Sequence, residues 1–239
     1  MPNRIKKSHL DCDDCDSKDK GIFCSLENES LTDVSDHKVT NTFKKGQTLF
    51  VEGNHPYGIY CISKGNIKLT KLSNDGKESI IRVVKSGDVL GHRSLFMDKC
   101  YAATATAMED TEVCFIDKTF ILKLMSDKPK VALSLIGQLS KDLGDSESKL
   151  SSLHQKNVRE RLAELLIILK ENHGEDLGKN RFKITIKLTR EEMATMIGAA
   201  NETLIRFITE FRENNLISQE GKYLIIEDED ALYEWAGLE

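Results

Sequence analysis

The stretch Thr189-Arg-Glu-Glu-Met-Ala-Thr-Met-Ile-Gly-Ala-Ala-Asn-Glu-Thr-Leu-Ile-Arg206 predicts two short helices separated by a turn at Gly198. The first helix begins with a capping box, because the Thr189 hydroxyl can accept a hydrogen bond from the Glu192 amide while the Glu192 carboxylate reaches back. The second helix carries its apolar residues on one face, namely Leu204, Ile208 and Phe211. Two such helices form a helix-turn-helix, a motif that reads DNA.

The outer face of the second helix is polar and holds Glu202 and Arg206 one turn apart. Arg can donate two hydrogen bonds to O6 and N7 of guanine, and Glu can accept one from the N4 amine of cytosine, so the pair can read G·C base pairs in a major groove. The alternative is a surface ion pair that contributes roughly 0.2–0.5 kcal/mol. The candidate DNA-binding residues are Arg190, Asn201, Glu202, Ile205, Arg206, Thr209, Arg212 and Lys222.

Two apolar runs follow the second helix and are joined by a turn at Gly221, which predicts the wing of a winged helix-turn-helix. The pattern from Leu188 to Ile226 resembles the C-terminal domain of the CRP/FNR family of bacterial transcription regulators, whose recognition helix carries Glu-Thr-x-x-Arg, here Glu202-Thr-Leu-Ile-Arg206. The resemblance implies a homodimer that binds a double-stranded DNA operator and acts together with RNA polymerase.

The composition limits the other function classes. With 239 residues and a net charge of -5, the chain has no global attraction for nucleic acid, so its DNA affinity must come from a local arrangement of basic residues. No Walker loop, nucleophile elbow or catalytic acid pair is present, so we expect no enzyme. No apolar run is long enough to span a membrane and no signal peptide is evident, which predicts a cytoplasmic protein without a membrane partner.

We expect an α+β chain with four parts: a cysteine-containing arm at 1–37, a β-jelly roll at 38–120, a dimerisation helix at 121–156, and the winged helix-turn-helix at 157–239. The second part consists of short β-rich runs punctuated by glycine, as a jelly roll or barrel requires. Its segments Lys45–Gly53, Ser63–Leu69 and Ser86–Gly91 resemble the cyclic-nucleotide-binding jelly roll of the CRP/FNR family.

The phosphate cassette of that jelly roll is altered. In cAMP-binding members it supplies a Gly-Glu pair for the ribose and a later Arg-Ser or Arg-Thr pair for the phosphate, whereas this chain has His92 after Gly91 and Tyr101-Ala102 at the later position. We therefore do not expect cAMP to bind, and a different small ligand stays open as an alternative.

The helical region between the two domains has an apolar heptad stripe, with Ser146 at one of its d positions. A narrow stripe on a long helix is typical of an association surface, because only a partner helix covers it completely. The pattern predicts a parallel homodimer, in line with the long dimerisation helix of the family. The expected contact residues are Ile136, Leu139, Leu143, Leu150 and Leu153.

The N-terminal arm carries Cys12-Asp-Asp-Cys15 and, after eight further residues, Cys24. Three thiolates in one segment can hold three corners of an iron–sulfur cluster or a zinc site. Cys114 lies at the position where the oxygen-sensing FNR proteins place their fourth cluster cysteine. The resemblance therefore implies a [4Fe-4S] cluster, held by these four cysteines, that oxygen or nitric oxide destroys.

Three alternatives to the cluster remain open, namely zinc, a metal-free dithiol, and an ordinary Cys114 that is a small buried apolar residue of its strand. The FNR proteins have fewer residues between the second and third arm cysteines, and the aspartates around the first two disfavour an anionic cluster and suit a dication such as zinc. A metal-free redox dithiol, including a thiol redox enzyme, is another possibility. Cys100 could replace Cys114 as the fourth ligand, and Cys61, in the apolar run Ile59–Ile62, is expected to pack inside the barrel.

Overall fold

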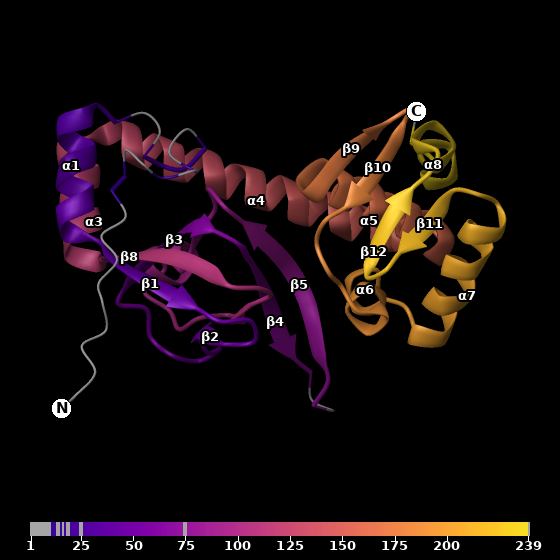
Figure 1. Cartoon of the computed structure of the whole chain (residues 1–239). Helices are drawn as coiled ribbons and strands as arrows, with labels where there is room; N and C mark the ends of the chain where they lie inside the picture. The colour runs from indigo at the N-terminus through magenta and orange to yellow at the C-terminus, as the bar shows by residue number, and fades with distance from the viewer. Residues whose placement is uncertain are drawn as a thin grey trace, which may run out of the picture. The chain divides into compact units, whose positions relative to one another are not determined.

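The computed structural model describes residues 11–12, 15, 17, 20–23, 26–73 and 76–238 (Figure 1). The chain divides into two compact units, residues 1–144 and 145–239. The division falls inside a long helix, α4 (Pro129–Gln155), rather than at the expected boundary between 156 and 157. In the described part of the chain, no helix combines the length and the apolar character of a membrane span.

The first unit contains two four-stranded antiparallel sheets, with strand orders β1-β8-β3-β6 and β2-β7-β4-β5. This arrangement confirms the β-rich domain expected from the spacing of its glycines. The strands are β1 (Val39–Phe43), β2 (Thr48–Phe50), β3 (Gly58–Lys64), β4 (Asn66–Leu72), β5 (Glu78–Lys85), β6 (Val89–Leu90), β7 (Thr104–Ala107) and β8 (Thr111–Asp117).

Strand β3 shows how the unit forms two cores, because its side chains alternate between the two faces of the sheet. Tyr60 and Ile62 belong to the core inside the jelly roll. Ile59 and Cys61 face the opposite way, into a second core that is covered by helices. These helices are α1 (Asn28–His37), α3 (Lys118–Asp127) and the first turns of α4.

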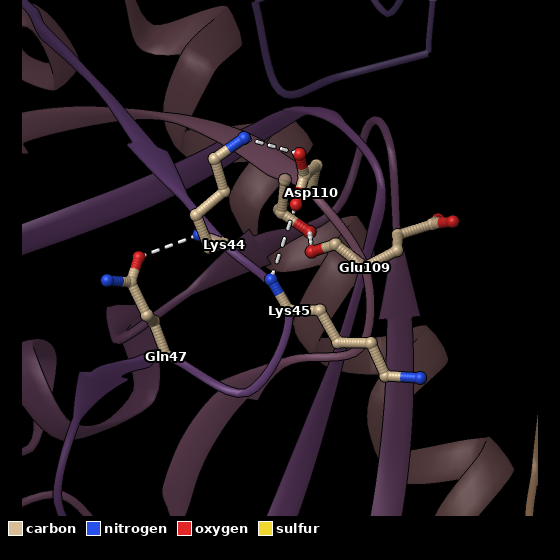
Figure 2. Close-up of polar contacts among 6 residues, drawn as sticks. Lys44, Lys45, Gln47, Glu109 and Asp110 are labelled. Carbon is tan, nitrogen blue, oxygen red and sulfur yellow. Dashed lines mark hydrogen bonds and ion pairs between the residues drawn. The ribbon is translucent and has the colours of Figure 1, made fainter.

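Turns at one end of the sheets are held by exposed polar contacts (Figure 2). Lys44 Nζ donates to Asp110 Oδ2 at 2.6 Å, and the Lys45 amide donates to Asp110 Oδ1 at 3.4 Å, which joins the β1–β2 turn to the β7–β8 turn. The Lys44 amide also donates to Gln47 Oε1 at 2.7 Å. Because these groups lie in water, we assign them a role in turn geometry rather than a large share of stability.

The region expected as one dimerisation helix, 121–156, contains two helices. Helix α3 ends at Asp127, and Lys128 leaves the helical region with φ -130° and ψ 80°. The physical reason is Pro129, which disfavours helical geometry at the residue before it and starts α4 in its own first turn.

The second unit confirms a winged helix-turn-helix. Its helices and strands are α5 (Val158–His173), β9 (Gly174–Gly178), β10 (Arg181–Ile184), α6 (Arg190–Met196), α7 (Asn201–Glu213), β11 (Ile217–Glu220), β12 (Tyr223–Ile226) and α8 (Glu229–Ala236). The strands form one antiparallel sheet in the order β11-β12-β10-β9. Buried Leu204 and Phe211 of α7 contribute to its core, where the Phe211 ring meets Trp235 edge-on at 5.0 Å between centroids.

Candidate functional site

Helix α6 and the following turn present α7 as the sequence predicts. The Glu192 amide donates to Thr189 Oγ1 at 3.1 Å, and the Thr189 amide donates to Glu192 Oε2 at 2.9 Å, so the capping box is formed. Gly198 makes the turn with φ +62°, a conformation that glycine adopts without strain. Arg161 Nε of α5 donates to the Ile197 carbonyl at 2.8 Å and fixes the end of α6.

Helix α7 buries the three apolar residues expected from its period, Leu204, Ile208 and Phe211. Their packing fixes the rotation of the helix about its axis, and it leaves the predicted DNA-facing side chains exposed. These are Asn201, Glu202, Ile205, Arg206, Thr209 and Arg212.

The candidate base-reading residues Glu202 and Arg206 form no ion pair with each other among the described residues, so the surface ion pair of the alternative interpretation is not made. The Arg206 guanidinium lies over the Phe207 ring instead, 5.0 Å from its centroid. The Thr209 hydroxyl donates to the Ile205 carbonyl within the helix at 3.0 Å. Both charged groups of this face are therefore available to a ligand.

Arg190 differs from the other candidates, because it is half-buried and held by the wing. Its Nη2 donates to Gln219 Oε1 of β11 at 3.0 Å. Burial lowers the pKa of this guanidinium, and the nearby Arg212 lowers it further. This hydrogen bond links α6 to the wing, and the DNA-binding role of Arg190 stays a prediction.

Two lysines in and after β10, which the sequence did not single out, lie against the wing. Lys222 is exposed in its turn, as expected. The ammonium groups of Lys183 and Lys187 lie over the Tyr223 ring, at 4.7 and 5.1 Å from its centroid. The position of these two lysines could not be predicted from the sequence, because the pairing of β10 with β12 is what brings Tyr223 beside them.

The apolar stripe along α4 is exposed in the single chain. Ile136, Leu143 and Leu150 keep 57–60% of their surface accessible, and Leu153 keeps 40%. Leu139 is half-buried. The structure adds Leu133, which is 67% exposed and begins the same side of the helix one turn earlier.

A second candidate site is a cavity of about 50 Å³ in the first unit, beneath the N-terminal arm. Its wall contains three of the four predicted metal ligands, Cys12, Cys15 and Cys114, and also Cys61 and Lys38. Cys61 was expected inside the barrel, and this is wrong: it lies on the other face of β3, toward the helices. Cys24 lies outside the described residues.

Polar contacts tie the arm to this cavity. Lys38 Nζ donates to Cys12 Sγ at 3.1 Å, and the Cys12 amide donates to Ser35 Oγ at 2.8 Å. On the other side, Cys15 Sγ lies 3.1 Å from Ser17 Oγ, whose hydroxyl donates to the Ile62 carbonyl. The arm is therefore docked on β3 and α1, which brings its cysteines to the strand cysteines.

The electrostatics of the cavity are set by buried thiols and the nearby Lys38 ammonium. Burial raises the pKa of Cys61 well above its ordinary value, and the neighbouring cysteines raise it further. Burial also raises the pKa of Cys114, which Lys38 opposes. Burial lowers the pKa of Lys38, but the potential of Cys114 and the contact with Cys12 outweigh this, so the net shift is upward. The site therefore favours an ammonium facing sulfur.

Among the described residues, no three His, Cys, Asp or Glu side chains are placed to share one metal ion. Cys100 is not among the residues that line this cavity, and its Sγ lies 3.6 Å from His55 Nε2, which does not favour the alternative in which Cys100 replaces Cys114.

Aromatic side chains fill the interior of the jelly roll. Tyr101, at the later cassette position, is 6% exposed and stacks on Phe50 with 3.9 Å between ring centroids. Burial raises the pKa of Tyr101, and the adjacent Tyr60 raises it further. His92, at the other altered position, is also buried, and its Nε2 lies 3.8 Å from Asp142 Oδ2 of α4.

Two family models match the chain. The cyclic nucleotide-binding domain matches residues 40–128, and the Crp-like helix-turn-helix domain matches residues 160–235. The CRP-like cAMP-activated global transcriptional regulator of Mycobacterium tuberculosis is 26% identical and covers 89% of this chain and 94% of its own length. The fumarate and nitrate reduction regulatory protein of Vibrio cholerae is 28% identical and covers 96% of this chain and 91% of its own length.

The fold is shared with solved structures. A mutant of CooA from Carboxydothermus hydrogenoformans has a TM-score of 0.72 at 20% identity, covering 90% of this chain and 94% of that one. These relatives are transcription regulators rather than enzymes. With both domains matched in order and with the recognition helix exposed as required, the chain belongs to the CRP/FNR family of transcription regulators.

Proposed function

We propose that this regulator is a homodimer that reads a near-palindromic DNA operator and senses oxygen, nitric oxide or redox state through an iron–sulfur cluster. The observation that carries the sensing part is the cavity, because Cys12 and Cys15 of the arm and Cys114 of β8 line it together although about a hundred residues separate them in sequence. The relative named as a fumarate and nitrate reduction regulator supports the same class of signal.

The four candidate donors are all cysteines, which is the ligand set of a [4Fe-4S] cluster. A [4Fe-4S] cluster is held by four thiolates at its corners, which spaces the sulfurs more widely than one tetrahedral zinc does. Cys12, Cys15 and Cys114 would hold three corners, and Cys24 would supply the fourth. When bound, the cluster supplies a redox-labile centre. Lys38 places a positive charge beside it, which offsets the negative charge of the thiolates.

The test is the metal content of protein purified without oxygen. We expect a brown chromophore with iron and sulfide that air bleaches together with operator binding. Cys114→Ser should lose the chromophore, whereas Cys100→Ser, whose sulfur lies outside the cavity, should keep it. Stoichiometric zinc in place of iron and sulfide would contradict the cluster and favour the zinc-sensing alternative. A colourless, metal-free protein that binds its operator would leave only thiol chemistry.

The jelly roll interior supports a sensor that does not use a cyclic nucleotide. A buried Tyr101 stacks on Phe50, and Tyr101-Ala102 occupies the later cassette position where cAMP-binding members have an arginine for the phosphate. This chain would thus differ from the relative whose name calls it cAMP-activated. Calorimetry with millimolar cAMP should show no binding heat, and a cAMP-dependent gain in operator affinity would contradict the proposal.

A further inference from the structure

The fourth cysteine of the cavity, Cys61, has no part in the proposed ligand set. We propose that Cys61 and Cys114 form a redox-active pair that closes to an intramolecular disulfide when Cys114 carries no metal. The inference goes beyond the proposed function, since it holds for metal-free protein whichever metal, if any, the centre takes. It assigns a covalent modification site that spans two strands.

The strand register places the two residues together. Cys61 of β3 lies directly opposite Cys114 of β8 in the antiparallel pair. Opposite residues in such a pair have Cα atoms about 4.5–5.5 Å apart. A disulfide needs a Cα separation of about 4.4–6.8 Å, so the backbone already satisfies its main requirement.

The side chains also point to the same place. Directly opposed residues leave a sheet on the same face, and both cysteines line the same cavity, which gives the sulfurs room to change rotamer. Both are free thiols in the structure, Cys61 half-buried and Cys114 buried. Burial slows their reaction, so we expect closure over minutes to hours rather than seconds.

The other two cavity thiols, Cys12 and Cys15, are less suited to form a disulfide with Cys61 or Cys114. Cys12 Sγ accepts a hydrogen bond from Lys38, and Cys15 Sγ contacts Ser17 Oγ. Both lie in the arm rather than on a strand paired with β3 or β8. The Thr40 hydroxyl lies 3.8 Å from Cys114 Sγ on the opposite neighbour, β1, which leaves the β3 side to Cys61.

The reaction balances with a low-molecular-weight disulfide such as oxidised glutathione as the oxidant. One cysteine sulfur attacks the glutathione disulfide, which forms a mixed disulfide and releases one glutathione thiol with the proton. The second cysteine sulfur then attacks the protein sulfur of the mixed disulfide, forming the Cys61–Cys114 bond and releasing the second glutathione thiol. Two protein thiols lose two electrons in total, and oxidised glutathione gains them.

Closure would affect any metal centre that Cys114 helps to hold. Metal ligation and the disulfide compete for the same Cys114 sulfur, because only a thiolate binds the metal. The oxidised protein would therefore be unable to rebuild its centre until a reductant opens the bond. In this way an oxidising signal would outlast the loss of the centre itself.

The experiment uses full-length protein, stripped of metal by a chelator under reducing conditions, freed of reductant and incubated with oxidised glutathione. After alkylation of the remaining thiols, peptide mass spectrometry should find a linked pair that contains Cys61 and Cys114. The link should be absent in Cys61→Ser and present in the matched control Cys100→Ser. A stable glutathione adduct, or links confined to Cys12 and Cys15, would overturn the proposal.

A second measurement separates this inference from the proposed function. Cys61→Ser should keep any metal that the unmodified protein binds, because Cys61 is not in the ligand set. After oxidation, the unmodified protein should no longer take up metal, and dithiothreitol should restore the uptake. In Cys61→Ser, oxidation should leave metal uptake unchanged. If the unmodified protein never binds metal, the cluster proposal fails while the linked peptide still decides the disulfide. Loss of metal in reduced Cys61→Ser would make Cys61 a ligand and overturn the inference.

Discussion

On the recognition helix, the buried residues decide which charges can meet DNA. Leu204 and Ile208 fix one face of α7 in the core, and this leaves Glu202 and Arg206 on the other. Among the described residues, Glu202 and Arg206 do not form an ion pair with each other. A free Arg and a free Glu at the start of an exposed helix suit the edges of a G·C pair.

We expect Arg206→Ala to weaken binding to a G·C-containing half-site by about 1–3 kcal/mol and to relax the base preference at one position. Affinities for the operator and for single-base variants, measured at one salt concentration, test this. Lys222→Ala in the wing turn is the control, because loss of a phosphate contact weakens all sequences alike and lowers the salt dependence. An equal loss on every sequence for Arg206→Ala would assign Arg206 to the phosphates.

His92 predicts a pH dependence of stability. Burial lowers its pKa below the ordinary 6.5, and although the Asp142 carboxylate opposes the shift, Arg82 and Arg93 add to it. The folded protein therefore prefers neutral His92, whereas the unfolded chain takes up a proton near pH 6.5. The stability contributed by this preference is present above pH 6.5 and is lost as the pH falls through 6.5 toward the folded pKa.

The measurement compares denaturant unfolding at pH 7.5 and pH 5. His92→Gln should lose less stability over this range than the unmodified protein does. His154→Gln is the matched control, because it removes an exposed histidine near the end of α4. If His92→Gln keeps the full pH dependence, other groups cause it.

At the scale of helices and strands, α4 combines two surfaces. Val131 and Leu135 pack into the first unit, whereas Ile136, Leu143 and Leu150 stay exposed. An apolar stripe of this length on a single chain favours a partner of the same kind, because a parallel pair of helices covers it with its own residues.

We expect Leu143→Glu to dissociate the dimer. Burial of one leucine side chain contributes about 1.5–3 kcal/mol, and a two-fold interface contains it twice, so the dissociation constant should rise by more than about 100-fold. Sedimentation over a range of concentrations measures it. Lys141→Glu, which adds a glutamate to the side of α4 away from the stripe, should leave the dimer intact, and an unchanged Leu143→Glu dimer would place the interface elsewhere.

The sequence predicts those elements whose signals are local. The capping box, the buried period of α7 and the glycine-bounded strands all depend on neighbours within a few residues, and the structure confirms them. The prediction for Cys61 was wrong because which face of β3 meets the helices depends on packing across the whole unit. The contact of Arg190 with Gln219 crosses 29 positions. Pairing at that range depends on the whole sheet, which no local pattern encodes.

At the scale of the whole molecule, the chain folds as two units that each have a core of their own. Ile116 of β8 is fully buried against the helices of the first unit, and Leu204 is fully buried in the second unit. Separate cores connected through one helix, α4, predict that each unit can lose its structure without the other.

Two probes report on the two units separately. The single tryptophan, Trp235, lies in the second unit, so its fluorescence follows that core. Alkylation of Cys114, only 6% exposed in the folded state, follows the first. Ile116→Ala should destabilise the first unit by about 2–5 kcal/mol and lower the denaturant midpoint for Cys114 alkylation while the Trp235 midpoint stays fixed. Leu204→Ala should do the reverse. If either substitution moves both midpoints together, α4 couples the two cores into one cooperative unit, and a signal at the cysteine cavity could then reach the recognition helix through stability alone.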